Sequence, residues 1–511
     1  MAPDTATSAS ATSDVAGGEE APASAGRRLR ESVPLRIALP PFVVTLIVML
    51  IGLGDRQLWR DENATWWAST LSFGDLRKLV ETVDVVLLPY YVLMHGWIAI
   101  FGDSETALRL PSALFMALAA AVIALIGRRL SDPATGLVAG LLVPVVPVIS
   151  RYGQEARPYA MAMLASVTAV WLLLRAIERP TVWRWLGYAV AVAWIGCSHV
   201  VALMALAAHF VLVLWAYLTT KKRALAGWPA AVLLAVLAIS PLVLRGQSQG
   251  KQISWIPDAT WERVQQFPGE VFMSFAVAGF FLVVGLGALA VTAFEKRAWT
   301  AGFLAVWTLL PPLIAYVTFD EFHFFYPRYL LFTVPAWILL GGFALRRLAG
   351  SETVTTLAAV TVVAAAGLAF AGWDQQAKVR SNAVESEYSF RAAAAFIRER
   401  QQPGDGIIFT GYPYLHRGFR YEWRDEPAPQ QPREILVDQP AGQAYSWVHP
   451  ACRDTRACLG ATERIWLVSS DPSGKPLDPL PANQQKVVTD LYVVAQRTVF
   501  HRLWVSELIK K

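Results

Sequence analysis

The sequence alternates long apolar segments with short clusters of Lys and Arg, and this pattern leaves few possible folds. Hydrophobic residues make up 55% of the 511 residues, whereas Asp, Glu, Lys and Arg together make up only 16%. Apolar segments of about 17 to 25 residues are long enough to cross a bilayer as helices. The low charge and the long apolar blocks are therefore typical of a polytopic α-helical membrane protein.

The apolar segments predict about eleven transmembrane helices. The first follows four arginines and ends near Gly54, and we interpret it as a retained span. It is long enough to cross the bilayer, and Leu53-Gly54-Asp55 is a poor cleavage site for a signal peptidase. The other ten are predicted at about 106–129, 135–150, 160–174, 185–197, 201–218, 228–244, 271–294, 300–318, 329–345 and 354–370.

The Lys and Arg clusters predict the orientation in the cytoplasmic membrane. A dense cluster follows every second span, as at Arg128-Arg129 and Lys221-Lys222-Arg223. Positive charge of this kind favours the cytoplasmic side, so we expect the N-terminus inside and, after an odd number of spans, the C-terminal region outside. The positive charges behind the net charge of +6 thus indicate the orientation of the helices in the membrane, not a nucleic-acid site. We expect membrane lipids, and no nucleic acid, as partners.

Composition divides the chain into three parts. Residues 1–30 are mostly small and polar and predict a disordered cytoplasmic tail, and residues 31–373 form the transmembrane domain. Residues 374–511 are mixed and predict a small extracytoplasmic α/β domain. Its expected elements are an amphipathic helix at Ser389–Gln401 and strands at Ile407–Thr410 and Ile465–Ser469.

Cys452 and Cys458 lie six positions apart in this C-terminal region. A small-loop disulfide between them requires an oxidising compartment, which agrees with the predicted outer location. Two free thiols are the alternative. The Cys-x5-Cys spacing is a poor zinc signal, because no nearby His or Cys pair completes a site.

The first outer loop, residues 55–105, is predicted to hold interfacial helices, because its apolar and amphipathic runs are short and rich in Trp and Tyr. Directly after the first span, the charged triplet Arg60-Asp61-Glu62 lies between Trp59 and the pair Trp66-Trp67. Charge and Trp are ordinary where a helix leaves the membrane, but two adjacent carboxylates are less so. We interpret this stretch as the reaction centre of a membrane enzyme.

Other polar groups gather at the predicted outer helix ends and indicate one outward cavity. Charges at this depth are costly unless they serve a cavity or a pair. An outer transferase would use a lipid-linked donor, whose phosphate suits Arg, while a carboxylate suits deprotonation of an acceptor. The groups are Asp55, Asp61, Glu62, Asp84, Arg109, Glu155, Arg157, His199, Lys251, His323 and Arg328.

Four short motifs occur in order at these outer ends. They are Asp61-Glu62, Ala107-Leu108-Arg109-Leu110-Pro111-Ser112-Ala113, Gln154-Glu155-Ala156-Arg157-Pro158-Tyr159 and Pro327-Arg328-Tyr329-Leu330-Leu331. Together they resemble the polyprenyl-phosphate-sugar-dependent glycosyltransferases of the GT-C fold, specifically the protein O-mannosyltransferase and aminoarabinose transferase group (glycosyltransferase family 39). The resemblance covers about residues 53–342.

The resemblance implies roles for particular residues. Asp61 would be the general base that activates the acceptor, with inversion at the anomeric carbon, and Glu62 would shape the acceptor side or share that role. Arg109 and Arg328 would hold the donor phosphate. The residues implied to line the same cavity are Glu155, Arg157, Tyr159 and His199, although a structural role for His199 is an equal alternative.

The sequence departs from the family pattern at one place, and several points stay open. Family members often carry a His before the Pro-Tyr-Tyr motif, and Asp84–Pro89 has none, so a metal role there is in doubt. We expect no cofactor, while the use of a divalent metal stays open. The implied partners are a polyprenyl-phosphate sugar and a glycan, lipid or protein acceptor.

Three other functions fit the same sequence less well. An arabinosyl transferase for cell-wall glycan would share the fold. A transporter or flippase of lipid-linked sugars would place its charges near the bilayer midplane, whereas here the charges lie at one face. A non-catalytic membrane scaffold with a partner-binding outer domain is the third.

Overall fold

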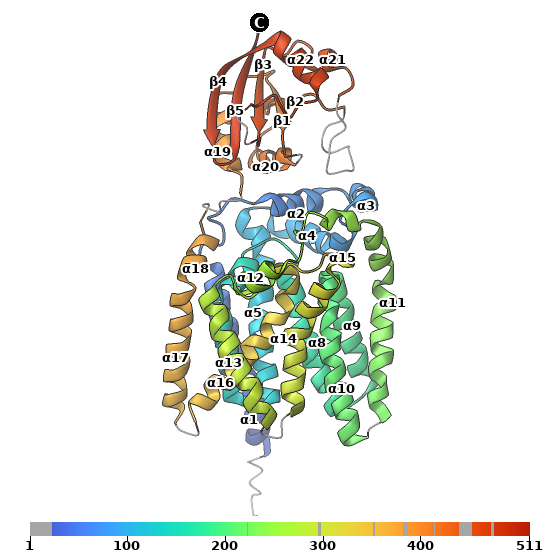
Figure 1. Ribbon diagram of the computed structural model, residues 1–511, viewed down its shortest axis with the longest axis vertical. Coiled ribbons are helices and arrows are strands. Elements are labelled where there is room, and N and C mark those ends of the chain that lie inside the picture. Colours follow the sequence, from blue (N-terminus) through green and yellow to red (C-terminus); the bar gives the residue numbers. More distant parts are fainter. Residues whose placement is uncertain are drawn as a thin grey trace, which may run out of the picture.

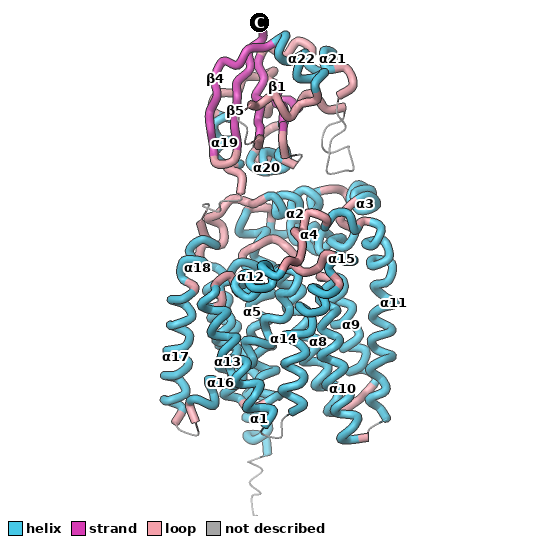
Figure 2. Tube along the Cα trace, in the orientation of Figure 1, coloured by secondary structure: helices cyan, strands magenta, loops and turns pink. Residues whose placement is uncertain are grey.

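The computed structural model describes residues 23–221, 223–294, 298–350, 353–381, 387–412, 414–438, 452–471 and 475–511. It consists of a helical bundle and a small domain of mixed helix and strand at one end of that bundle (Figure 1; Figure 2). We call the end of the bundle next to this C-terminal domain the capped end. The protein is thus a polytopic α-helical membrane protein with a small α/β domain, as the sequence predicts.

Eight helices in the described part of the chain are long and apolar enough to cross a membrane. A ninth span results if the bent pair Pro133–Val145 and Pro147–Gly153, which meet at 68°, is counted as one. The eight are α5 (Glu105–Leu130), α8 (Tyr159–Glu178), η3 with α10 (Val200–Thr220), α11 (Gly227–Ser248), α13 (Phe275–Phe294), α14 (Ala298–Val317), η6 with α16 (Pro327–Leu348) and α17 (Val354–Ala371).

The count of eight or nine is lower than the eleven predicted, although each predicted span coincides with a helix. The two others are the apolar part of α1 (Ala23–Leu50), which runs over Pro34–Leu50, and α9 (Val182–Ser198). Each is 17 residues long, so both fall short of the length of the eight. Helix α1 begins at Ala23, inside the predicted tail, and residues 1–22 of that tail lie outside the described residues.

Helix α5 lies inside the bundle and packs against α1, α6 (Pro133–Leu142) and α8. Small residues let these helices approach closely. A Cβ atom at Gly136 of α6 would lie 2.2 Å from the carbonyl oxygen of Ala124 in α5, so no larger residue fits there. This close packing lies toward the end of α5 that is away from Arg109.

Short helices lie across the capped end between α1 and α5 (Figure 1). They are α2 (Arg60–Thr70), α3 (Phe73–Thr82), η1 (Val85–Leu87) and α4 (Leu88–Phe101). The Ser72 side chain accepts a hydrogen bond from the Asp75 backbone and so fixes the start of α3. The predicted interfacial helices of the first loop are confirmed as helices at this end. Further short helices of the described chain are α7 (Pro147–Gly153), α12 (Trp261–Phe272), α15 (Phe319–Phe322) and α18 (Trp373–Val379).

The C-terminal domain contains a five-stranded sheet of order β2-β1-β3-β5-β4. Strands β2, β1 and β3 are parallel, and β5 pairs antiparallel with both β3 and β4. The apolar runs that predicted two strands form its centre, β1 and β3. The bounds are β1 (Gly406–Thr410), β2 (Arg433–Glu434), β3 (Arg464–Ser469), β4 (Tyr492–Phe500), β5 (Leu503–Lys510), α19 (Phe390–Arg398), α20 (Leu415–Glu422), α21 (Thr455–Leu459) and α22 (Ala482–Leu491).

Polar contacts fix the C-terminal domain on the capped end. Helix α20 packs on α2, and the Tyr421 hydroxyl donates to the Asp103 carbonyl oxygen at 3.0 Å. The Trp66 indole of α2 donates to the Asp103 carboxylate at 2.8 Å and lies edge-on to the Tyr421 ring. The domain therefore rests on α2, the helix whose first turn contains Asp61.

The boundary between the two parts lies slightly later than the predicted residue 374. Helix α18 follows α17 and packs against α7 of the bundle. The Arg380 guanidinium, just after α18, donates to the carbonyl oxygens of Val48 and Ile51 at the end of α1. The described part of the C-terminal domain then begins at Glu387.

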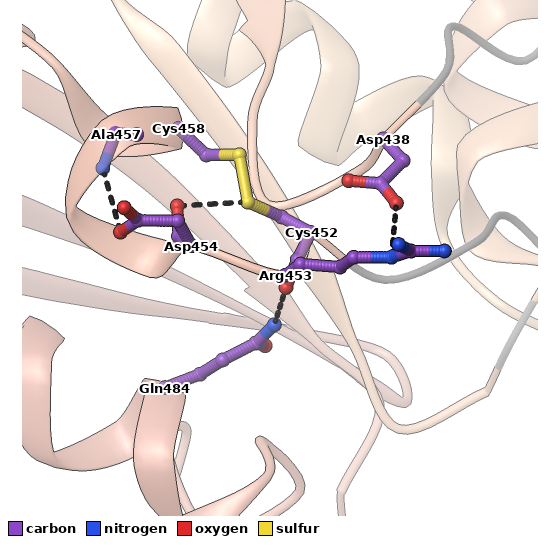
Figure 3. The surroundings of a disulfide bond; sticks show 7 residues. All are labelled: Asp438, Cys452, Arg453, Asp454, Ala457, Cys458 and Gln484. Atoms are coloured by element: carbon purple, nitrogen blue, oxygen red, sulfur yellow. Dashed lines mark hydrogen bonds and ion pairs between the residues drawn. A yellow bond between two sulfur atoms is a disulfide. The ribbon is translucent and has the colours of Figure 1, made fainter.

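The structure joins Cys452 and Cys458 in a disulfide beside α21, with the Cα atoms 6.6 Å apart (Figure 3). The Gln484 side chain of α22 donates to the Cys452 carbonyl oxygen at 3.3 Å, which ties the loop to a second helix. The described part of the chain holds one further cysteine, Cys197, as a free thiol.

Removing this disulfide is expected to destabilise the C-terminal domain by about 2 kcal/mol, because the bond closes a loop of few residues in the unfolded chain. The test is the thermal unfolding midpoint of the full chain with Cys452 and Cys458 both replaced by Ser, and Cys197→Ser serves as the control. Equal midpoints for the double variant and the control would contradict this expectation.

Candidate active site

Arg109 in α5 fixes the chain that leads into α2. An arginine side chain has five N–H donors, and all five are used here. Nε and Nη2 donate to the two Glu62 carboxylate oxygens at 2.8 and 2.7 Å. The remaining three donate to the carbonyl oxygens of Leu53, Arg56 and Gln57 at 2.8 to 3.0 Å. Arg109 is 1% exposed, so it holds residues 53–62 in one conformation.

Glu62 is the buried counterpart of Arg109 and is 0% exposed. Besides the Arg109 bonds, its carboxylate accepts from the backbone N–H of Trp59 at 3.3 Å and of Ala156 at 2.9 Å. Burial alone would raise the pKa of Glu62, but the charge and hydrogen bonds of Arg109 outweigh it and lower that pKa to about 2. Glu62 is therefore a permanent anion that joins α2, α5 and the loop before α8.

These contacts correct two roles implied by the resemblance. Arg109 has no N–H left for a donor phosphate, and Glu62 has no exposed oxygen to offer to an acceptor. The reason is that the two side chains satisfy each other inside the protein, where an unpaired charge would be costly. Both side chains are therefore buried against each other rather than open to solvent.

Asp61 points the other way from its neighbour, because consecutive residues of a helix lie on different faces. Its carboxylate is 23% exposed. One oxygen lies 3.3 Å from Nη1 of Arg328, and the other lies 3.7 Å from Nε of Arg60. Arg157 supports this first turn of α2 by donating to the Asp61 carbonyl oxygen at 3.4 Å and to the Thr65 hydroxyl at 3.3 Å. Asp61 is the accessible carboxylate of the pair.

Arg328 lies in η6 (Pro327–Thr333) within a group of aromatic rings. Its guanidinium carbon is 5.1 to 5.8 Å from the ring centres of Tyr159, Trp255, Tyr326 and Tyr329. Aromatic faces attract a cation, so the rings hold the guanidinium in place. Its Nε has no hydrogen-bond partner among the described residues. Arg328 therefore keeps donor capacity beyond its pair with Asp61.

A cavity of about 540 Å³ opens beside Arg328. Met273, Phe275 and Ala371 form apolar parts of its wall, and they come from the ends of α12, α13 and α17. Its polar lining includes two arginines, Arg328 and Arg263, two acids, Glu270 and Asp374, and Tyr152. The cavity therefore combines a cationic group with an apolar wall next to membrane-spanning helices, a combination that suits an amphipathic lipid phosphate.

The other residues predicted to line the cavity, Glu155, Arg157, Tyr159 and His199, lie around Asp61 and Arg328 but do not line this cavity. The His199 ring lies 5.8 Å from Tyr159 and 4.9 Å from Tyr329, and it lines a small void of about 10 Å³ together with Arg328. Glu155 is fully buried, and its carboxylate lies 3.2 Å from Nε of Arg151. The structure thus brings Asp61, Arg157, Tyr159, His199 and Arg328 together.

Several residues of this site were given no individual role from the sequence. Arg60 pairs with Asp61, Trp255 and Tyr326 flank Arg328, and Arg151 pairs with Glu155. The tyrosines on both sides of Pro327-Arg328 were a usable signal for the aromatic surroundings. Trp255 gave none, because it lies in a polar loop more than 70 residues before Arg328. No cluster of three or more His, Cys, Asp or Glu with metal-site geometry occurs in the part of the chain that the structure describes.

Comparison with known proteins gives one family model and several solved structures. The family model described as dolichyl-phosphate-mannose-protein mannosyltransferase matches residues 87–244, which is less than half of the chain. No curated protein matches the sequence. The match covers α4 of the first loop and the helices from α5 into α11, but not α2 or α3.

Two similar structures are ArnT from Cupriavidus metallidurans and the mycobacterial arabinofuranosyltransferase AftD. ArnT is 15% identical, with a TM-score of 0.59 in the apo state, over 92% of this chain and 97% of that chain. A second ArnT structure, bound to undecaprenyl phosphate, has a TM-score of 0.58. AftD is 15% identical with a TM-score of 0.51, over 93% of this chain and 40% of that chain. The chain therefore has the GT-C fold of these proteins.

Proposed function

With the GT-C fold as the premise, we propose that this protein is a glycosyltransferase that moves a sugar from a polyprenyl-phosphate donor to an acceptor. The observation that carries the proposal is the pairing of the partly exposed Asp61 with Arg328, which lines a cavity with an apolar wall. The acceptor is a hydroxyl or amine of a glycan, lipid or protein, and transfer proceeds with inversion.

The donor fits the Arg328 side of the site. A lipid phosphate needs a cation for its head group and an apolar surface for its chain, and the cavity supplies both. ArnT, which shares this fold, binds undecaprenyl phosphate in the second of its two structures, and this supports a donor of the same class. Arg328, rather than Arg109, is the donor-phosphate residue.

Asp61 and Arg328 divide the reaction between them. Asp61 takes the proton of the acceptor as the acceptor oxygen or nitrogen forms a bond to the anomeric carbon. The bond from that carbon to the phosphate oxygen breaks at the same time, and its electron pair stays on the phosphate. Arg328 stabilises the charge that develops there, which in a site of low dielectric is a large contribution.

The proposal also includes the orientation of the protein in the membrane. The capped end faces the outside of the cytoplasmic membrane, and the N-terminus lies in the cytoplasm. The Lys and Arg clusters at alternate helix ends support this orientation. A disulfide in the C-terminal domain is consistent with an oxidising compartment on that side.

Binding of undecaprenyl phosphate tests the donor assignment. Arg328→Ala is expected to weaken it by about 10- to 100-fold, because a charge-assisted hydrogen bond contributes about 1.5–3 kcal/mol. Affinity is measured on the purified protein in detergent by native mass spectrometry or ligand-induced thermal stabilisation. Arg346→Ala, at the end of α16 away from the capped end, is the matched control. Equal affinities for the two variants would contradict the assignment.

A transporter of lipid-linked sugars is the main rival, and the position of the charges argues against it. Transport sites lie near the bilayer midplane, where interrupted helices meet. Here Asp61 lies in the first turn of a short helix across the capped end, and Arg328 lies in the short η6 segment before α16. The charges therefore lie where an enzyme with an extramembrane acceptor needs them.

A further inference from the structure

Trp255 is an exposed tryptophan beside the cation proposed to hold the donor phosphate. The Arg328 guanidinium lies over its indole, with the guanidinium carbon 5.2 Å from the ring centre. The indole also lies edge-on to the Tyr326 ring, at 5.2 Å between the ring centres. Trp255 is nevertheless 46% exposed. The two contacts therefore hold the indole in place and leave much of its surface accessible.

The loop that carries Trp255 is fixed to the helices of the first outer loop. The amide nitrogen of Gln249, directly after α11, donates to the Val80 carbonyl oxygen of α3 at 3.0 Å. The amide oxygen of the same side chain accepts from the Val85 backbone N–H at 2.9 Å. On the other side of Trp255, Ile256 is buried in the core of the bundle. The loop is thus anchored both before and after the exposed indole.

Arg328 adjoins three different features of the site. Together with Tyr326, it lines the cavity that has the apolar wall. Its Nη1 atom lies 3.3 Å from the Asp61 carboxylate, and its guanidinium lies over the Trp255 indole. Neither Asp61 nor Trp255 belongs to the lining of that cavity. The base and the indole therefore lie beside the same guanidinium but outside the space proposed for the lipid chain.

The donor has to fit these three features at once. In the proposed function, the apolar chain occupies the cavity and the phosphate lies at Arg328. A single oxygen atom joins the sugar to that phosphate, so the sugar ring must lie next to the guanidinium. Its anomeric carbon must also face the acceptor that Asp61 activates. The sugar is therefore expected outside the cavity, in the space beside Arg328 that Asp61 and Trp255 border.

Trp255 is the most accessible of the four rings that surround Arg328. Tyr159 is buried, and Tyr326 and Tyr329 are partly buried, whereas Trp255 is exposed. A sugar ring presents C–H groups on its faces and hydroxyl groups around its edge. An indole can cover such a face while the hydroxyl groups keep their contacts with water or with polar side chains.

We propose that Trp255 binds the sugar of the donor by stacking against the C–H face of its ring. The inference rests on the proposed function and divides donor recognition between two residues. Arg328 binds the phosphate, and Trp255 binds the sugar. A lipid phosphate that carries no sugar makes the contact with Arg328 alone. Trp255 thus lets the protein bind its donor more tightly than the lipid phosphate that remains after transfer.

The test compares Trp255→Ala with the native protein for two kinds of ligand. One is undecaprenyl phosphate, and the other is each undecaprenyl-phosphate-linked sugar that the native protein consumes. Affinities are measured in detergent by native mass spectrometry without an acceptor. The variant should bind the lipid-linked sugar about tenfold more weakly, as expected for the loss of one aromatic contact. Its affinity for undecaprenyl phosphate should stay close to native, and Trp255→Phe, which keeps an aromatic face, should retain most of the affinity for both ligands.

Trp261→Ala is the matched control. Trp261 begins α12, a little later in the same outer segment, and is 67% exposed. Exposed tryptophans of this kind commonly anchor a protein at the membrane interface, so this variant should bind both ligands like the native protein. The proposal is overturned if Trp255→Ala binds the lipid-linked sugar as well as Trp261→Ala does. It is also overturned if Trp255→Ala weakens both ligands by the same factor, as a residue that only holds Arg328 would.

Failure of the inference differs from failure of the proposed function. If the native protein neither binds undecaprenyl phosphate nor consumes any lipid-linked sugar, the proposed function is wrong, and the role of Trp255 is wrong with it. If the native protein does both and Trp255→Ala behaves like Trp261→Ala, only the role of Trp255 is wrong.

Discussion

Replacing Asp61 with Asn is expected to lower the rate of sugar transfer by about 100- to 10,000-fold, the usual contribution of a positioned general base. Asn has nearly the same shape but does not accept the proton of the acceptor. Its amide can still lie beside Arg328, so undecaprenyl phosphate should bind with little change. The measurement is the turnover number in detergent, together with the affinity for undecaprenyl phosphate.

Asp75→Asn is the control for this substitution, because Asp75 lies on the neighbouring helix α3 at the same end of the bundle. It should retain native turnover. Normal turnover by Asp61→Asn with any donor would show that Asp61 is not the base. A loss of lipid binding that matches the loss of rate would instead indicate that Asp61 acts through Arg328.

Breaking the buried pair of Glu62 and Arg109 is expected to have the largest effect on stability. Arg109→Met leaves the Glu62 carboxylate buried without its cation, and such a change typically costs about 3–5 kcal/mol. It also removes three hydrogen bonds to the loop before α2. The thermal unfolding midpoint in detergent should fall sharply, and turnover should fall with it because Asp61 is no longer held in place.

The double variant Glu62→Gln with Arg109→Met should be less destabilised than the sum of the single variants, because neither charge is then left unpaired. The control is Arg77→Met, which removes a surface pair with Glu81 on α3, where the Arg77 side chain is 82% exposed. Exposed pairs contribute little, so the control midpoint should barely move. An Arg109→Met midpoint equal to that of the control would contradict the structural role.

Acid should weaken the buried pair of Glu62 and Arg109. The folded protein lowers the pKa of Glu62 from 4.5 to about 2. A carboxyl group whose pKa is lowered by folding stabilises the protein above its unfolded value, and that stabilisation is lost as the pH falls toward the folded value. The contribution of Glu62 is therefore present above about pH 4.5 and lost between there and pH 2.

The sequence was sufficient to predict the membrane-protein class, the first-loop helices and the central strands of the C-terminal domain. Each of these depends on local patterns of apolar residues and on helix or strand periodicity. The adjacent acids Asp61 and Glu62 were also visible. The sequence does not give the direction of each side chain, so only the structure showed that Glu62 is buried against Arg109 while Asp61 is partly exposed.

The contacts that the sequence did not reveal join residues far apart in the chain. Glu62 and Arg109 are 47 residues apart, and Gln57 and Tyr388 are 331 apart. An arginine at the predicted membrane edge suggested a phosphate ligand, although Arg109 in fact satisfies a buried carboxylate. The short apolar part of α1 and the short α9 account for two of the spans that differ, because hydropathy marks apolar segments better than it marks their ends.

The central claim is that the protein transfers sugar from a lipid-phosphate donor. The most direct measurement supplies the purified native protein, in liposomes, with a panel of undecaprenyl-phosphate-linked sugars and a matching panel of nucleotide sugars. We predict that at least one lipid-linked sugar is consumed with release of undecaprenyl phosphate, and that no nucleotide sugar is. Turnover with nucleotide sugars alone, or movement of intact lipid-linked sugar across the bilayer without release, would contradict this claim.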